Sequence, residues 1–264
     1  MKKIFNILTL TLVILGVATT ANALQYGFGY SEIDLRSFDY SDNVSVYTRN
    51  LGFYASGYAL ALDQNEMAAD GFNDFYYRQV MDEWAMAYTS DAFSVAGTQD
   101  GINSSLAQAS AGDGAGQYSG ALAGTFVSAY QFYVPNGGDI TISIDYYLEN
   151  AVFGNEPGFA MAGSGALLGI YQGGGTVDQG SWLDLAIGYG EDYAEDFGTL
   201  EITLSGLRAG SLFSVFAGTA AYAAAYTETA SVPEPATMLI LGTGLVGIAG
   251  LGRRKFRNKQ HDRS

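Results

Sequence analysis

Carboxylates are the residues of this 264-residue chain that are numerous enough to suggest catalysis or metal binding. The chain has 27 Asp and Glu, no Cys and a single His, His261. Residues 24–232 therefore contain no Ser-His-Asp triad, no Cys-His pair and no zinc site built from His or Cys. They also lack Lys, which excludes a Ser-Lys pair. A pair of carboxylates at glycosidase spacing remains open, because chance brings some of so many acids together.

The densest acidic group is Glu191, Asp192, Glu195 and Asp196. Carboxylate oxygens suit Ca²⁺, so one interpretation of this group is a calcium site. The other is a solvated acidic loop. We favour the loop and expect no metal, no cofactor and no catalytic residue in the chain.

Aromatic side chains offer a second kind of chemistry, because their rings stack on the faces of sugars. The chain has 19 Tyr, 15 Phe and two Trp. Trp84 and Trp182 are the candidates for a carbohydrate site. Aromatic residues at strand spacing are more often part of a core, which is the interpretation we favour for both.

Charge is distributed very unevenly along the sequence. Residues 24–232 contain four of the 12 Lys and Arg and 25 of the 27 acids, so their formal charge is 4 − 25 = −21. Such a surface repels nucleic acid and anionic lipid and attracts cations and water. We therefore expect no nucleic-acid partner.

The elements that must position these side chains are predicted to be strands. Apolar residues alternate with polar or small ones in four segments, 140–148, 183–189, 200–204 and 213–226. Turn residues separate them at 135–138, 173–175 and 209–210. This pattern predicts an all-β fold, an antiparallel β-sandwich of jelly-roll type, for a domain at residues 24–231.

Two segments are harder to interpret. Residues 65–87 fit a helical period only in part, so a helix and an irregular segment remain alternatives. Residues 109–120 are rich in Gly, Ala and Ser, which is typical of a loop.

The N-terminus has the pattern of a secretory signal peptide at residues 1–23. Lys2 and Lys3 precede an apolar run, and Ala21 and Ala23 supply the small residues of a cleavage site. We expect export by the Sec machinery and cleavage by signal peptidase after Ala23. An uncleaved N-terminal anchor is the alternative.

The C-terminal tail, residues 232–260, has three parts. Pro233-Glu234-Pro235 comes first, followed by an apolar stretch at 236–252 that reaches the lower limit for a transmembrane helix. A basic cluster at 253–259 follows, and its positive charges predict a cytoplasmic end for the tail. The cluster's stop-transfer residues are Arg253, Arg254, Lys255 and Arg257.

This tail resembles the PEP-CTERM sorting domain in the order and spacing of its parts. The resemblance implies that exosortase recognises Pro233, Glu234 and Pro235 and that the helix is then removed. It also implies a Gram-negative bacterium that makes exopolysaccharide. An ordinary single-pass anchor is the alternative.

The expected product is a non-enzymatic structural protein of the cell surface or the extracellular biofilm matrix. It is first anchored in the inner membrane with its body in the periplasm. A carbohydrate-binding module for the cell's own exopolysaccharide is the first alternative. A carboxylate-dependent glycosidase is the second.

Overall fold

The computed structural model describes residues 25–46, 52–77, 83–112, 116–154, 158–172, 175–188 and 190–227. The chain divides into two compact units, Met1–Glu228 and Thr229–Ser264, and every described residue lies in the first. The segments predicted to be a signal peptide and a sorting tail lie outside the described residues.

Within the described ranges the secondary structure consists of strands, with no helix. The strands are β1 (Gln25–Tyr40), β2 (Ser45–Val46), β3 (Gly52–Asp63), β4 (Met67–Tyr77), β5 (Glu83–Tyr88), β6 (Ala92–Gln99), β7 (Ile102–Ala111), β8 (Tyr118–Val134), β9 (Gly138–Gly154), β10 (Gly158–Gln172), β11 (Gly175–Ile187), β12 (Gly190–Leu207) and β13 (Ser211–Thr227).

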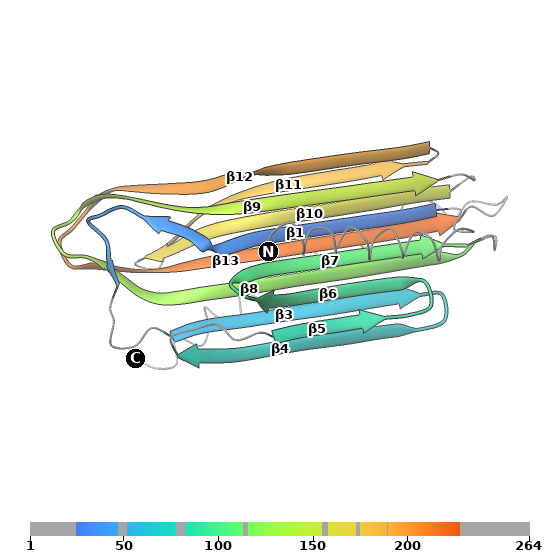
Figure 1. The fold of residues 1–264 in the computed structure, drawn as a ribbon, viewed down its shortest axis with the longest axis horizontal. Coiled ribbons are helices and arrows are strands. Elements are labelled where there is room, and N and C mark those ends of the chain that lie inside the picture. The colour runs from blue at the N-terminus through green and yellow to red at the C-terminus, as the bar shows by residue number, and fades with distance from the viewer. Residues whose placement is uncertain are drawn as a thin grey trace. The chain divides into compact units, whose positions relative to one another are not determined.

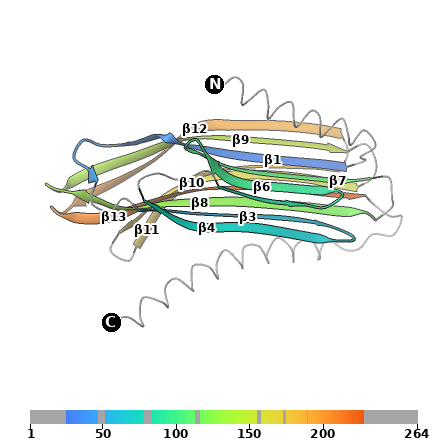
Figure 2. The same cartoon turned by 60° about the horizontal axis from the view of Figure 1, so that its bottom comes forward.

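The strands form two antiparallel sheets. Sheet A has the order β12-β9-β1-β7-β6-β5, and sheet B has the order β11-β10-β13-β8-β3-β4, with the short β2 paired to β8 (Figure 1). Figure 2 shows the sheets as two layers. The predicted all-β, sandwich-like fold is confirmed. The sandwich is not an eight-stranded jelly roll, because each of its sheets contains more than the four strands per sheet of that fold.

One half of the space between the sheets is filled by large aliphatic side chains. Alternate residues of β9, among them Ile140, Ile142 and Ile144, are buried and pack against Phe213 and Val215 of β13. The alternation predicted for residues 140–148 and 213–226 therefore corresponds to real strands that bury one face each.

The other half of the interface is filled by alanine. Its buried members include Ala59, Ala61, Ala85, Ala87, Ala107, Ala109, Ala121 and Ala223. Polar side chains reach across this seam to the opposite backbone: Ser31 Oγ donates to Ala220 O at 2.9 Å, and Ser94 Oγ to Leu60 O at 2.9 Å. A hydroxyl one carbon from the backbone makes such bonds only if the sheets lie closer than the usual ~10 Å.

This seam explains why strand residues were missed in two segments. Residues 65–87, expected to be a helix or irregular, contain β4 and β5. Residues 109–120, expected to be a loop, contain the end of β7 and the start of β8. In β5 the inner residues Ala85 and Ala87 are small and buried, whereas Trp84, Met86 and Tyr88 on the outer face are large and exposed, so the hydrophobic alternation does not mark the buried face.

The first and last described strands meet at one end of the sandwich. Gln25, which begins β1, pairs with Gly154, while Thr227, which ends β13, pairs with Gly158. A methyl group on Gly158 would lie 2.9 Å from Gln25 Nε2, which places the two chain ends beside each other. The polypeptide therefore enters and leaves the described body at the same end.

Candidate functional site

The acidic group at residues 191–196 lies on a strand, so the predicted loop is wrong, although Glu191, Asp192 and Glu195 are exposed to solvent as predicted. Glu191, Asp192, Glu195 and Asp196 belong to β12, where successive side chains point to opposite faces. No cluster of three or more potential metal ligands occurs in the described part of the chain. Alternation thus separates the carboxylates that a calcium site would have brought together.

Asp196 faces the other sheet. Its Oδ2 accepts hydrogen bonds from Ser181 Oγ of β11 at 2.6 Å and from Tyr146 Oη of β9 at 2.9 Å. The bond from Ser181, and then that from Tyr146, hold the pKa of Asp196 below its ordinary value despite partial desolvation. Asp196 therefore links β12, at the edge of sheet A, to β11, at the edge of sheet B.

Tyrosines and glutamates alternate on the outer face of sheet A. Tyr147 of β9 donates to Glu149 at 3.1 Å and to Glu195 of β12 at 3.4 Å, and Tyr193 also donates to Glu195 at 3.3 Å. Tyr30 and Tyr147 lie with ring centroids 6.2 Å apart. Burial, followed by the charge of Glu149, raises the pKa of Tyr193 to about 12, so its phenol remains a donor at neutral pH.

This row contains the carboxylate pair that the sequence left open. Glu149 and Glu195 are directly opposite each other in the β9–β12 ladder. Both accept a hydrogen bond from Tyr147, and exposed Tyr193 and Phe197 lie on the same strand as Glu195. The pair is therefore engaged by phenols on an open sheet face, whereas glycosidase carboxylates flank a bound sugar from opposite sides.

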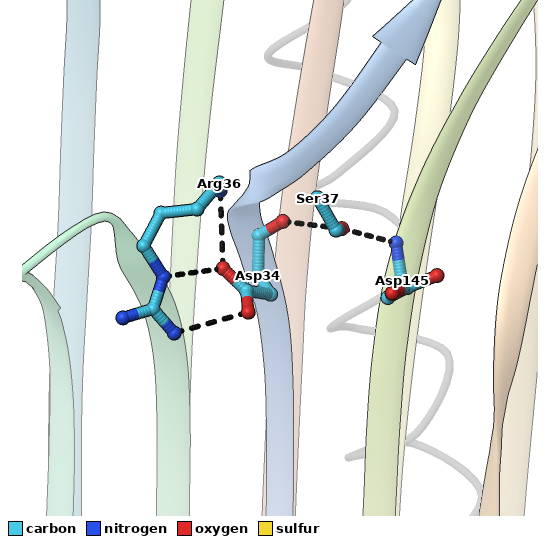
Figure 3. A network of polar contacts seen from close by, with 4 residues as sticks. All are labelled: Asp34, Arg36, Ser37 and Asp145. Carbon is cyan, nitrogen blue, oxygen red and sulfur yellow. Dashed lines mark hydrogen bonds and ion pairs between the residues drawn. The ribbon is translucent and has the colours of Figure 1, made fainter. Parts of the chain in front are cut away.

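A second polar network fixes an irregularity in β1 (Figure 3). Arg36 Nε donates to Asp34 Oδ1 at 2.7 Å, and Nη2 donates to Oδ2 at 3.0 Å. Ser37 Oγ donates to Asp34 O at 2.7 Å and accepts from the Asp145 backbone N–H at 2.8 Å. These bonds lie at the register shift between Asp34 and Asp39, and the one from the Asp145 N–H to Ser37 Oγ ties the irregular part of β1 to β9.

The aromatic residues show a repeated arrangement that sequence analysis missed. In many ladders an aromatic side chain lies directly opposite a glycine and covers it. The pairs are Phe72–Gly57, Tyr58–Gly124, Trp84–Gly97, Trp182–Gly165, Phe216–Gly169, Tyr222–Gly163 and Tyr146–Gly198. The high Gly and aromatic contents are the available sequence signal, but pairing them requires the strand register.

Neither tryptophan is a core residue, so our favoured interpretation of both is corrected. Trp84 on sheet A is 42% exposed and Trp182 on sheet B is 61% exposed. Each indole rests on a glycine of the neighbouring strand, Gly97 or Gly165, and its other side is open to solvent. The structure places the two tryptophans on different sheets, and they do not form one site.

The residues predicted for processing lie outside the described ranges. These are Ala21, Ala23, Pro233, Glu234, Pro235, Arg253, Arg254, Lys255 and Arg257. Within those ranges there is no helix of the length and apolar character needed to cross a membrane.

Residues 231–255 match the PEP-CTERM protein-sorting motif. The predicted resemblance is confirmed, and the motif implies an exported, membrane-anchored precursor that exosortase processes in a Gram-negative bacterium. The search of curated proteins gives no match.

Solved structures give only weak similarity. Vicilin from Capsicum annuum is 7% identical over 74% of this chain and 72% of its own, with a TM-score of 0.11. The protein YhaK from Escherichia coli is 10% identical over 74% and 86%, with a TM-score of 0.11. The C-terminal globular domain of oligosaccharyltransferase from Pyrococcus abyssi is 9% identical over 77% and 50%, with a TM-score of 0.13. These values carry no argument about fold or function.

Proposed function

We propose, from the premise that residues 231–255 are a PEP-CTERM sorting motif, that this chain is a non-catalytic structural protein of the cell surface or extracellular matrix. Exosortase releases it from the inner membrane after recognising Pro233, Glu234 and Pro235. The body then functions in contact with exopolysaccharide outside the cell.

The observation that supports this proposal is that polar side chains of the body form hydrogen bonds within the sandwich. Ser31 and Ser94 bond the sheets together, and Asp196 is held by Ser181 and Tyr146. These groups serve as cross-links within the sandwich. Disulfides are excluded by the absence of Cys, so a secreted body of this kind depends on packing and such bonds for its stability.

The sorting step is tested by replacing Pro233, Glu234 and Pro235 together with Ala in the full-length protein. Glu228→Ala, which removes one acid outside residues 231–255, is the control. We expect the triple variant to stay at precursor length in the inner-membrane fraction. The control and the wild type should shorten, except in cells lacking exosortase. Normal shortening and release of the triple variant would contradict the proposal.

A further inference from the structure

The outer face of sheet B carries two aromatic rings in one row across the strands. Trp182 of β11 is opposite Gly165 of β10, and Gly165 is opposite Ala220 of β13. Ala220 is opposite Gly124 of β8, which in turn is opposite Tyr58 of β3. The strands β11, β10, β13, β8 and β3 are consecutive neighbours in the sheet (Figure 1).

Both rings lie with a face against the sheet. A methyl carbon on Gly165 would be 2.6–2.7 Å from Cε3, Cδ2 and Cζ3 of Trp182. One on Gly124 would be 2.6–2.7 Å from Cε1, Cζ and Oη of Tyr58. No point in the plane of an aromatic ring is 2.6–2.7 Å from three consecutive atoms of its planar group at once. The added methyl carbon would therefore lie above the ring face. One face of each ring therefore covers a glycine.

The opposite faces of the rings are open, since Trp182 is 61% and Tyr58 48% exposed. Trp182 of β11 covers a glycine of β10, and Tyr58 of β3 covers a glycine of β8. The two rings therefore lie over β10 and β8, which are separated in the sheet only by β13. Two interstrand spacings place them about 10 Å apart. That separation is about the length of a disaccharide unit, and the only side chain between the two glycines in this row is the methyl group of Ala220.

The charge of this face limits what it can bind. The strands of sheet B contain no Lys or Arg in the ranges that the structure describes. Asp178 and Asp184 of β11 lie on the same face as Trp182 by strand alternation, and Asp184 accepts a hydrogen bond from Tyr222 Oη at 2.9 Å. A carboxylate can accept further bonds from hydroxyl groups, but it repels uronate, sulfate and phosphate groups.

We propose that the outer face of sheet B is a binding surface for a neutral polysaccharide, with Trp182 and Tyr58 as the two rings on which alternate sugar units stack. The apolar C–H faces of pyranose rings pack on the open faces of the two aromatic rings. Carboxylates at the β11 edge accept bonds from sugar hydroxyls. The inference goes beyond the structural role proposed above and does not depend on sorting.

The test is affinity electrophoresis of the full-length protein in detergent. The gels contain hydroxyethylcellulose, glucomannan, laminarin or dextran as neutral probes, or alginate as an anionic one. We expect retardation by at least one neutral probe and none by alginate. Trp182→Ala and Tyr58→Ala should each weaken binding about tenfold, because truncation of a central aromatic anchor typically removes a large share of the binding energy.

Trp84→Ala is the matched control, since Trp84 also covers a glycine but lies on sheet A. Trp84→Ala and Trp182→Ala should both melt at a lower temperature than the wild type, but Trp84→Ala should bind like the wild type. The proposal is overturned if the wild type binds none of the neutral probes, or if it binds alginate equally well. It is also overturned if Trp182→Ala retains full binding, or if Trp84→Ala loses as much.

Discussion

Gly29 offers the sharpest test of the narrow seam between the sheets. A methyl group on Gly29 of β1 would lie 2.5 Å from Gly163 O of β10 and 2.8 Å from Tyr222 O of β13. Carbon–oxygen contacts in sheets normally measure about 3.3–3.6 Å. Both oxygens belong to the backbone of paired strands, so Gly29→Ala requires the backbone of β10 and β13 to shift relative to β1.

Gly120→Ala is the appropriate reference. Gly120 also lies within a strand, but its added methyl would meet Leu62 at 3.6 Å and Ala223 O at 3.8 Å, which are ordinary contacts. Both variants lose backbone freedom in the unfolded chain, a gain in stability of about 0.4–1 kcal/mol that cancels in the comparison. What remains is overpacking, which typically costs about 1–3 kcal/mol.

We therefore expect Gly29→Ala to be about 2 kcal/mol less stable than Gly120→Ala, since overpacking costs of this kind centre there. For a body of this size the melting temperature would be about 4–8 °C lower. Thermal melts followed by circular dichroism, at matched pH and salt, give the comparison. Equal melting temperatures for the two variants would refute the close approach of the sheets.

Two further predictions follow from the strand faces. Ile142→Asp should abolish the folded state by burying a carboxylate at a position of 0% exposure, whereas Thr141→Asp on the opposite face should remain folded by circular dichroism. Equal stability of the two variants would contradict our assignment of Ile142 to the buried face of β9 and of Thr141 to the opposite face. Millimolar Ca²⁺ should raise the melting temperature no more than NaCl of equal ionic strength, because alternation on β12 separates Glu191 and Glu195 from Asp192 and Asp196. Both salts should stabilise the body by screening its repulsion, and an extra gain with Ca²⁺ would reveal a site.

The fold was predictable where large apolar residues alternate with polar ones. Ile142 and Val215 are examples, because only one face of their strands carries large apolar side chains. Prediction failed where small residues fill the core, as at Ala85 and Ala109, because a buried alanine gives little hydrophobic contrast with its outward neighbours, such as the exposed Trp84 and Met86. Packing against the opposite sheet, more than the hydrophobic pattern of their own sequence, determines that these segments are strands.

The candidate site was predictable only in part. Composition indicated aromatic residues as ligand platforms, and Trp182 was among the candidates. Its partner Tyr58 could not be found, since 124 residues separate them and four successive ladders bring them into one row. The acidic group at 191–196 was misinterpreted for the opposite reason. Its four carboxylates are close together in the sequence, but in an extended strand they point alternately to opposite faces.

The position of β13 has a mechanical consequence. The chain leaves the body at Thr227, and β13 lies inside sheet B with β10 on one side and β8 on the other. A pull on the C-terminal tail along the strand loads both ladders of β13 in shear, so many hydrogen bonds must break together. An edge strand pulled sideways would peel one bond at a time. The body is therefore built to hold against tension transmitted through its C-terminal connection.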